Sequence, residues 1–308
     1  MENKEKFKNI EDYIIYWDDF FKEWNKGESH QEELLKSDNI WGNHRGEVRT
    51  VKKTGKLKST KLEFNVLPQP YLGDINSHSV ITLNLNPSRS KKGEKIHVLK
   101  NLEKGNENDV FEEEHLPNFK KAKNYYQYAK DFPTYDINFW QNQKNWIHRI
   151  FQNLVKEEPS DKKNKEEIKP FAIEICPWGS KSFQKLEIDK EIIDYMDKYV
   201  FDVIEKVIKN SKLKMVLTVG KAYYDIFDHC VEFNIKNEIS NLKNKPKELD
   251  WPQTKDKKSG KDRDVNRSFS IWKRKEIFYL NTYASGSNKS PGEDFIEIEK
   301  KLIKEYLK

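Results

Sequence analysis

The fold is decided by the stretch VITLNLNPSRS at residues 80–90. Its first part is aliphatic and β-branched, and the polar turn Asn86-Pro87 follows directly. A short apolar run that ends in turn residues is typical of a buried strand. We therefore predict a strand at 80–85, with a polar loop beginning at its carboxyl end.

Similar patterns surround this stretch on both sides. Three more short apolar runs occupy residues 171–176, 215–219 and 277–281. Helical spacing of apolar residues occurs at 8–26, 139–154, 192–208, 222–233 and 295–307. Strands that alternate with helices favour a parallel sheet covered on both faces. The prediction is an α/β fold with a central, mostly parallel sheet of about four strands sandwiched by helices.

Polar segments divide the chain further. We predict an N-terminal helical extension at 1–60 and a main domain at 61–308. The main domain carries polar insertions near 91–130 and 236–267. The charged stretch at 52–61 is predicted to be a loop or hairpin.

The charge balance is only mildly basic. There are 57 Lys and Arg against 51 Asp and Glu, a net charge of +6. This excess alone does not establish nucleic-acid binding. Basic residues gather at 89–95 and 255–267, in predicted loops that can contact phosphates. The first of these clusters contains Arg89, Lys91 and Lys92.

Two cysteines, Cys176 and Cys230, lack the spacing of a metal site. The first residues are charged, without the apolar core of a signal peptide. No stretch approaches the ~18 apolar residues of a membrane span. We therefore predict a reduced, cytoplasmic protein that needs no metal or cofactor, contacts no membrane and is a monomer.

The four predicted strand ends resemble motifs of the uracil-DNA glycosylase superfamily. VITLNLNPSRS resembles the first motif, GLNPG in the mismatch-specific branch, and YASGSN at 283–288 resembles the second, NPSGLN. FAIEICPW at 171–178 lies where the superfamily carries its base-reading strand, and MVLTVGKAYYDIF at 215–227 resembles its strand–glycine–helix unit. The resemblance covers most of the region 68–295. It implies a uracil-DNA glycosylase-like fold that flips a base out of DNA and cuts its N-glycosidic bond.

The first motif implies a role for three residues. Asn86 matches the Asn that positions the attacking water, which suits a cationic sugar that needs only a weak, well-placed nucleophile. Asn84 faces the same side by strand alternation and can help to hold the site. Ser88 replaces the Tyr that blocks C5 substituents in the classical branch. The base pocket is therefore predicted to admit a pyrimidine with a C5 substituent. The alternative is that Asn86 and Ser88 simply form a turn.

Glu174 departs from the superfamily pattern. It aligns with the Asn that reads uracil, yet an ionised Glu only accepts hydrogen bonds and a protonated one donates just one. Cytosine offers an N4 amine, for which Glu is the expected partner. A protonated Glu174 can also donate to cytosine N3, which requires a pKa raised by burial. The alternative is a Glu in a salt bridge.

The second motif departs at Tyr283, where the superfamily has His or Asn. Tyr283 can donate a hydrogen bond to the departing base, or the register slips so that Asn281 or Thr282 serves. The resemblance places the DNA-backbone contacts in the following loop, which contains Ser285, Gly286, Ser287, Asn288 and Lys289. Phe132 or Tyr135 is a candidate to stack on the flipped base, and Trp178 to line the base pocket.

Together Glu174 and Ser88 favour a cytosine with a bulky C5 group. We predict a monofunctional glycosylase that leaves an abasic site in phage DNA containing modified cytosine, as anti-phage glycosylases of the superfamily do. One alternative is a repair enzyme for uracil or mispaired thymine. Another is a DNA-binding protein that has kept the fold and lost catalysis.

Overall fold

The structure is a computed structural model, and the residues it describes fall into two compact units. The described residues are 6–24, 26, 33–34, 47–51, 57–61, 68–85, 124–131, 145–150, 169–178, 188–230, 232–240, 251–255, 261–283, 291 and 293–307. Unit 1 draws on Met1–His78, Leu83–Pro133 and Phe171–Asn210. Unit 2 draws on Ser79–Thr82, Thr134–Pro170 and Ser211–Lys308.

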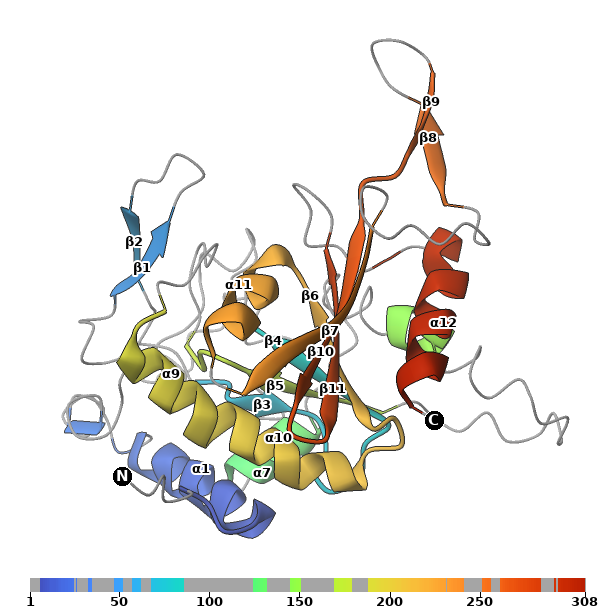
Figure 1. The fold of residues 1–308 in the computed structure, drawn as a ribbon. Coiled ribbons are helices and arrows are strands. Elements are labelled where there is room, and N and C mark those ends of the chain that lie inside the picture. The colour runs from blue at the N-terminus through green and yellow to red at the C-terminus, as the bar shows by residue number, and fades with distance from the viewer. Residues whose placement is uncertain are drawn as a thin grey trace, which may run out of the picture. The chain divides into compact units, whose positions relative to one another are not determined.

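A mixed sheet of seven strands replaces the four-stranded, mostly parallel sheet of the prediction. Its order is β3-β5-β4-β6-β11-β10-β7 (Figure 1). The strands are β3 (Tyr71–Leu72), β4 (Val80–Asn84), β5 (Pro170–Glu174), β6 (Met215–Val219), β7 (Phe233–Ser240), β10 (Ser268–Arg274) and β11 (Ile277–Tyr283). β11 pairs with β6 in parallel, whereas β3–β5, β10–β11 and β10–β7 are antiparallel. The α/β class is confirmed, but the predicted number of strands and the mostly parallel pairing were wrong.

The four predicted strands are all present, and two of the three missed ones, β3 and β7, have physical reasons. β3 has only two residues, too few for a periodic signal. β7 ends the strand order, and most of its side chains are exposed or half-buried, so it lacks an apolar run. The helix predicted at 222–233 ends earlier than expected. α11 spans Lys221–His229, and the strand β7 begins at Phe233.

Unit 1 packs aromatic side chains between helices and strands. α1 (Ile10–Trp24) confirms the predicted N-terminal helix, and it buries Tyr13, Trp17 and Trp24 on one face. α7 (Tyr125–Asp131) contributes Tyr125, whose hydroxyl donates to the carbonyl of Tyr71 at 2.8 Å. The rings of Tyr71 and Tyr125 meet edge to face at 5.1 Å between centroids. Such contacts bury the large apolar faces while the hydroxyl keeps a partner.

The helical region predicted at 192–208 is confirmed in unit 1. It runs through α9 (Lys190–Met196), the π-helical turn η1 (Asp197–Phe201), α10 (Asp202–Val207) and the 3-10 turn η2 (Ile208–Asn210). Asp189 caps its start by accepting from the backbone N–H of Ile192 at 2.9 Å. Unit 1 also includes an antiparallel hairpin of β1 (Glu47–Val51) and β2 (Leu57–Lys61), so the stretch 52–61, predicted to be a loop or hairpin, holds the turn and the second strand of a hairpin that begins at Glu47.

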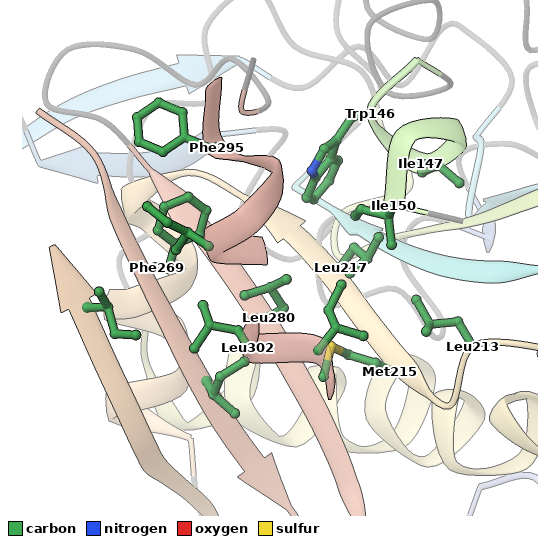
Figure 2. Close-up of a cluster of buried hydrophobic side chains, with 14 of the residues drawn as sticks. Trp146, Ile147, Ile150, Leu213, Met215, Leu217, Phe269, Leu280, Phe295 and Leu302 are labelled. Atoms are coloured by element: carbon green, nitrogen blue, oxygen red, sulfur yellow. The ribbon is translucent and has the colours of Figure 1, made fainter. Parts of the chain in front are cut away.

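In unit 2, side chains from helices pack on both faces of the strands β6, β11 and β10. On one face, α12 (Ile296–Tyr306), which follows the 3-10 turn η3 (Glu293–Phe295), and the helical residues 145–150 form one apolar cluster with the strands (Figure 2). Leu217 and Leu280 point into this cluster. On the other face, Phe227 of α11 packs against Tyr279 at 5.4 Å between ring centroids. The alternation of Tyr279 and Leu280 between faces follows from the period of a strand.

A second short hairpin lies between β7 and β10. The antiparallel hairpin of β8 (Gln253–Lys255) and β9 (Asp262–Asp264) lies within the segment predicted as an insertion, and residues 236–240 of that segment belong to β7. No helix in the described part of the chain is both long and apolar enough to span a membrane.

Truncation of Trp24 is expected to destabilise the protein strongly. Its indole is fully buried and lies 4.9 Å from that of Trp178, so Trp24→Ala leaves a cavity and should lower the free energy of unfolding by about 3–5 kcal/mol. Ile15→Ala on the exposed face of the same helix, where the side chain is 51% exposed, should change it by less than about 0.5 kcal/mol. Urea denaturation measures both, and equal effects would contradict the packing assigned to α1.

Candidate functional site

Asn84 and Glu174 form a buried polar pair in unit 1. They are the last residues of β4 and β5, and Asn84 Nδ2 donates to Glu174 Oε1 at 3.0 Å. Only 6% of Asn84 and 4% of Glu174 is exposed. The structure thus brings together Glu174, predicted to read the base, and Asn84, predicted to help hold the site.

Backbone hydrogen bonds fix both ends of this pair. The N–H of Ile175 donates to the carbonyl of Asn84, and that of Cys176 to Leu85, each at 2.9 Å. On the other side, the N–H of Glu174 donates to the carbonyl of Pro70 at 2.9 Å. The backbone of Glu174 is therefore held on both sides, which preorganises its carboxyl group.

The chemical state of Glu174 follows from its burial. Loss of hydration disfavours the carboxylate and raises the pKa of Glu174 to about 8, while the hydrogen bond from Asn84 opposes this rise. No described residue forms a hydrogen bond with Glu174 Oε2, which is itself buried. Near neutral pH the group is therefore mainly a carboxylic acid, with Oε1 accepting from Asn84 and Oε2 available to donate. A buried donor without a partner costs free energy, which a ligand can recover.

The raised pKa should make stability depend on pH. Between its ordinary pKa near 4.5 and its folded value of about 8, Glu174 keeps a proton that the unfolded chain releases. The free energy of unfolding should therefore fall as pH rises through this window, by on the order of 5 kcal/mol in total. Glu174→Gln cannot titrate and should lack this part of the decline. Denaturation of both proteins at about pH 5 and about pH 8.5 measures the difference, and parallel declines would contradict it.

Trp178 follows the pair and is fully buried. α1 packs against its indole through Trp24 and through Phe20, whose ring centroid is 6.2 Å away. The Cys176 thiol donates to the backbone carbonyl of Trp178 at 3.6 Å, and burial raises the pKa of this thiol. The structure thus gives Trp178 a packing role in unit 1, and its predicted contact with a base stays a prediction.

A second set of polar residues lies at the strand ends of unit 2. Thr218 Oγ1 donates to Asn281 Oδ1 at 2.9 Å, and both side chains are buried. Asn281 Nδ2 has no hydrogen-bond partner among the described residues. The next residue, Thr282, accepts from Arg267 at 3.3 Å through Oγ1. Tyr283 is half-buried, and its ring meets that of Tyr224 edge to face at 6.2 Å.

Three residues of the second motif lie at the end of β11, namely Asn281, Thr282 and Tyr283. Each remains a candidate to donate a hydrogen bond to the departing base. The sequence analysis did not single out Thr218. The feature that could have indicated it is a hydroxyl group inside an otherwise aliphatic strand, at the position that pairs with Asn281.

Several predicted residues lie outside the described residues. They are the catalytic candidate Asn86, the base-contact candidates Ser88, Phe132 and Tyr135, and the DNA-contact candidates Arg89, Lys91, Lys92, Ser285, Gly286, Ser287, Asn288 and Lys289. Their assigned roles stay predictions.

Within the described ranges, no group of three or more His, Cys, Asp or Glu side chains is arranged to hold a metal ion. Comparisons with protein-family models, with curated proteins and with solved structures found no match to this chain.

Proposed function

We propose that the protein is a monofunctional DNA glycosylase that excises a C5-substituted cytosine, such as glucosylated hydroxymethylcytosine, and leaves an abasic site. The observation that supports this most directly is the buried acid Glu174, held through one oxygen by Asn84 and without a described partner on the other. It is a preformed pair of acceptor and donor at the carboxyl end of two neighbouring strands, where sheets of this class place their ligands.

The acid form of Glu174 matches one edge of cytosine. Cytosine N4 is a donor and N3 is an acceptor on the Watson–Crick edge. Oε1 retains a lone pair beside its bond from Asn84 and can accept from N4, while the Oε2 hydroxyl can donate to N3. The ionised form has no donor for N3, so recognition requires the proton that burial retains.

The remaining steps need residues assigned from the motifs. A base stacked in a duplex is shielded, so the enzyme must flip the nucleotide out. Cleavage of the N-glycosidic bond passes through a cationic sugar, and Asn86 would position the water that attacks it. Ser88 would leave room for a C5 substituent, and the basic residues at 89–95 and 255–267 would bind phosphates. An enzyme selective for a base that the host lacks would spare host DNA, which favours a role against phages.

The test compares three substrates. Purified protein is incubated with phage DNA that contains glucosylated hydroxymethylcytosine, with uracil-containing DNA and with plain cytosine DNA. Abasic sites are counted after alkaline cleavage. We expect cleavage of the modified DNA alone. Cleavage of uracil DNA alone would instead make the protein a repair enzyme, and DNA binding with no cleavage of any substrate would overturn the glycosylase assignment.

A further inference from the structure

The acid form of Glu174 can hold its proton on either of two oxygens. Only 4% of this residue is exposed, and no cation among the described residues forms an ion pair with it. In a protonated carboxyl group, one oxygen is a carbonyl that accepts hydrogen bonds and the other is a hydroxyl that donates one. Glu174 therefore presents an acceptor beside a donor, and the position of its proton decides which oxygen is which.

The two positions of the proton match two different classes of base. Cytosine and its C5 derivatives present the N4 amine as a donor and N3 as an acceptor. Uracil and thymine present O4 as an acceptor and N3–H as a donor, which is the reverse order. A base of the wrong class, bound in the same pose, would set acceptor against acceptor and donor against donor. An acid whose proton is fixed on one oxygen therefore selects one class of base.

Asn84 decides between the two positions of the proton. Its Nδ2 donates to Glu174 Oε1 at 3.0 Å, and only 6% of Asn84 is exposed. A carbonyl oxygen is a better acceptor for this N–H than a hydroxyl oxygen, so the hydrogen bond directs the proton to Oε2. Oε2 is buried and has no hydrogen-bond partner among the described residues. The free protein therefore holds an acceptor at Oε1 and a donor at Oε2.

The amide of Asn84 occupies a position that an apolar side chain could fill. Asn84 ends β4 after the residues Val-Ile-Thr-Leu at 80–83, and all five are buried. A buried amide costs free energy unless it is hydrogen-bonded, and Leu has a similar volume without that cost. The carbonyl of Asn84 accepts from the N–H of Ile175 at 2.9 Å, and the N–H of Glu174 donates to the carbonyl of Pro70 at 2.9 Å. These bonds hold the amide against the acid before any ligand binds.

We infer that Asn84 determines specificity between cytosine-type and uracil-type bases, because its amide fixes the acceptor of Glu174 at Oε1 and the donor at Oε2. The inference rests on the proposed function, in which Glu174 reads the flipped base. Asn84 acts through Glu174 and is therefore a positioning residue. Its replacement should change the ratio at which the two classes of base are excised, whereas the loss of a merely structural residue would lower both rates together.

Infrared spectroscopy of the free protein tests the position of the proton without DNA. The carbonyl stretch of a protonated carboxyl group moves to lower frequency when its carbonyl oxygen accepts a hydrogen bond. At about pH 6 the acid form predominates, and a difference spectrum against the same protein with Glu174→Gln isolates this band. Asn84→Leu lacks the donor and should move the band to higher frequency. An unmoved band would overturn the inference, and a wild-type protein without the band would overturn recognition by the acid as well.

Competition between two matched bases tests specificity. Glucosylated hydroxymethylcytosine and glucosylated hydroxymethyluracil carry the same C5 group and differ only at position 4 and at N3. When both duplexes compete in one reaction, the ratio of excised bases gives the ratio of their kcat/KM values. Asn84→Leu should lower the preference for cytosine about tenfold, because either oxygen of Glu174 can then hold the proton. Asn84→Asp keeps the shape of the side chain and should lower the preference further, since its carboxylate accepts from a hydroxyl at Oε1.

Thr82→Val is the matched control. Thr82 is a buried residue of β4, two positions before Asn84, and its hydroxyl has no hydrogen-bond partner among the described residues. This change should leave both the infrared band and the preference unaltered. An unaltered preference in both Asn84 variants, or an equal loss of both rates, would overturn the specificity role while leaving the glycosylase proposal intact. No excision of either base by the wild-type protein would overturn the proposed function and, with it, the specificity role.

Discussion

Excision of modified cytosine is expected to fall about tenfold for each pH unit above about pH 8, because the proposed recognition of the base by Glu174 requires its acid form. Below that pH the acid form predominates and the rate should level off. Glu174→Gln should remove this dependence, since its amide donates from the position of Oε2 at every pH while its carbonyl oxygen still accepts from Asn84. Leu has a similar volume but neither a hydrogen-bond donor nor an acceptor, so the excision rate of Glu174→Leu should be about 10²–10³-fold lower than that of the wild-type protein.

Single-turnover rates at saturating DNA, measured across this pH range for the three proteins, separate two roles of the acid. A Gln variant that is active and independent of pH means that Glu174 only reads the base. A Gln variant as inactive as the Leu variant means that its proton is transferred to the departing base. A wild-type rate that rises above pH 8 would contradict recognition by the acid form.

Asn86→Ala is expected to lower excision by about 10²–10³-fold, because the attacking water would lose the group proposed to position it. DNA affinity should change little, since the lost contact is to water and not to phosphate. Asn86→Asp retains an oxygen that can accept from the water and should keep more activity than Asn86→Ala. A matched control is Asn76→Ala, which removes an exposed Asn of unit 1 and should leave the rate unchanged.

Alkaline cleavage after a single turnover measures the rates of these variants, and fluorescence anisotropy measures their DNA affinity. Undiminished excision by Asn86→Ala would show that the first motif is only a turn. A parallel loss of affinity and rate would place Asn86 in DNA binding.

Local patterns predicted the elements that bury a continuous apolar surface. The strands β4, β5, β6 and β11 and the helix α1 were all visible in this way, because their core positions repeat with a period of two or 3.6 residues. β7 was not visible, since six of its eight residues are half-buried or exposed at the end of the strand order. The mixed character of the sheet followed from β7 and β10, whose antiparallel pairing depends on partners that no local pattern identifies.

Some residues of the candidate site could be predicted from local patterns in the sequence, and others could not. Asn84 and Glu174 were predictable because each ends an apolar strand, and polar residues in that position of an α/β sheet converge. The Thr218–Asn281 bond and, in the core of unit 2, the bond from Trp146 to Glu299 were not predictable. The first joins residues 63 positions apart, and the second joins residues 153 positions apart. The polar character of these residues alone fits a solvated surface equally well.

The hydrogen bond between Asn84 and Glu174 joins residues 90 positions apart in the chain. Closing so long a loop costs chain entropy before any contact repays it, so this bond should form late in folding. The β10–β11 hairpin turns within two residues, at Lys275 and Glu276, and can form early. A nascent chain would thus acquire this hairpin locally, while the buried pair of Asn84 and Glu174 assembles only as distant strands come together.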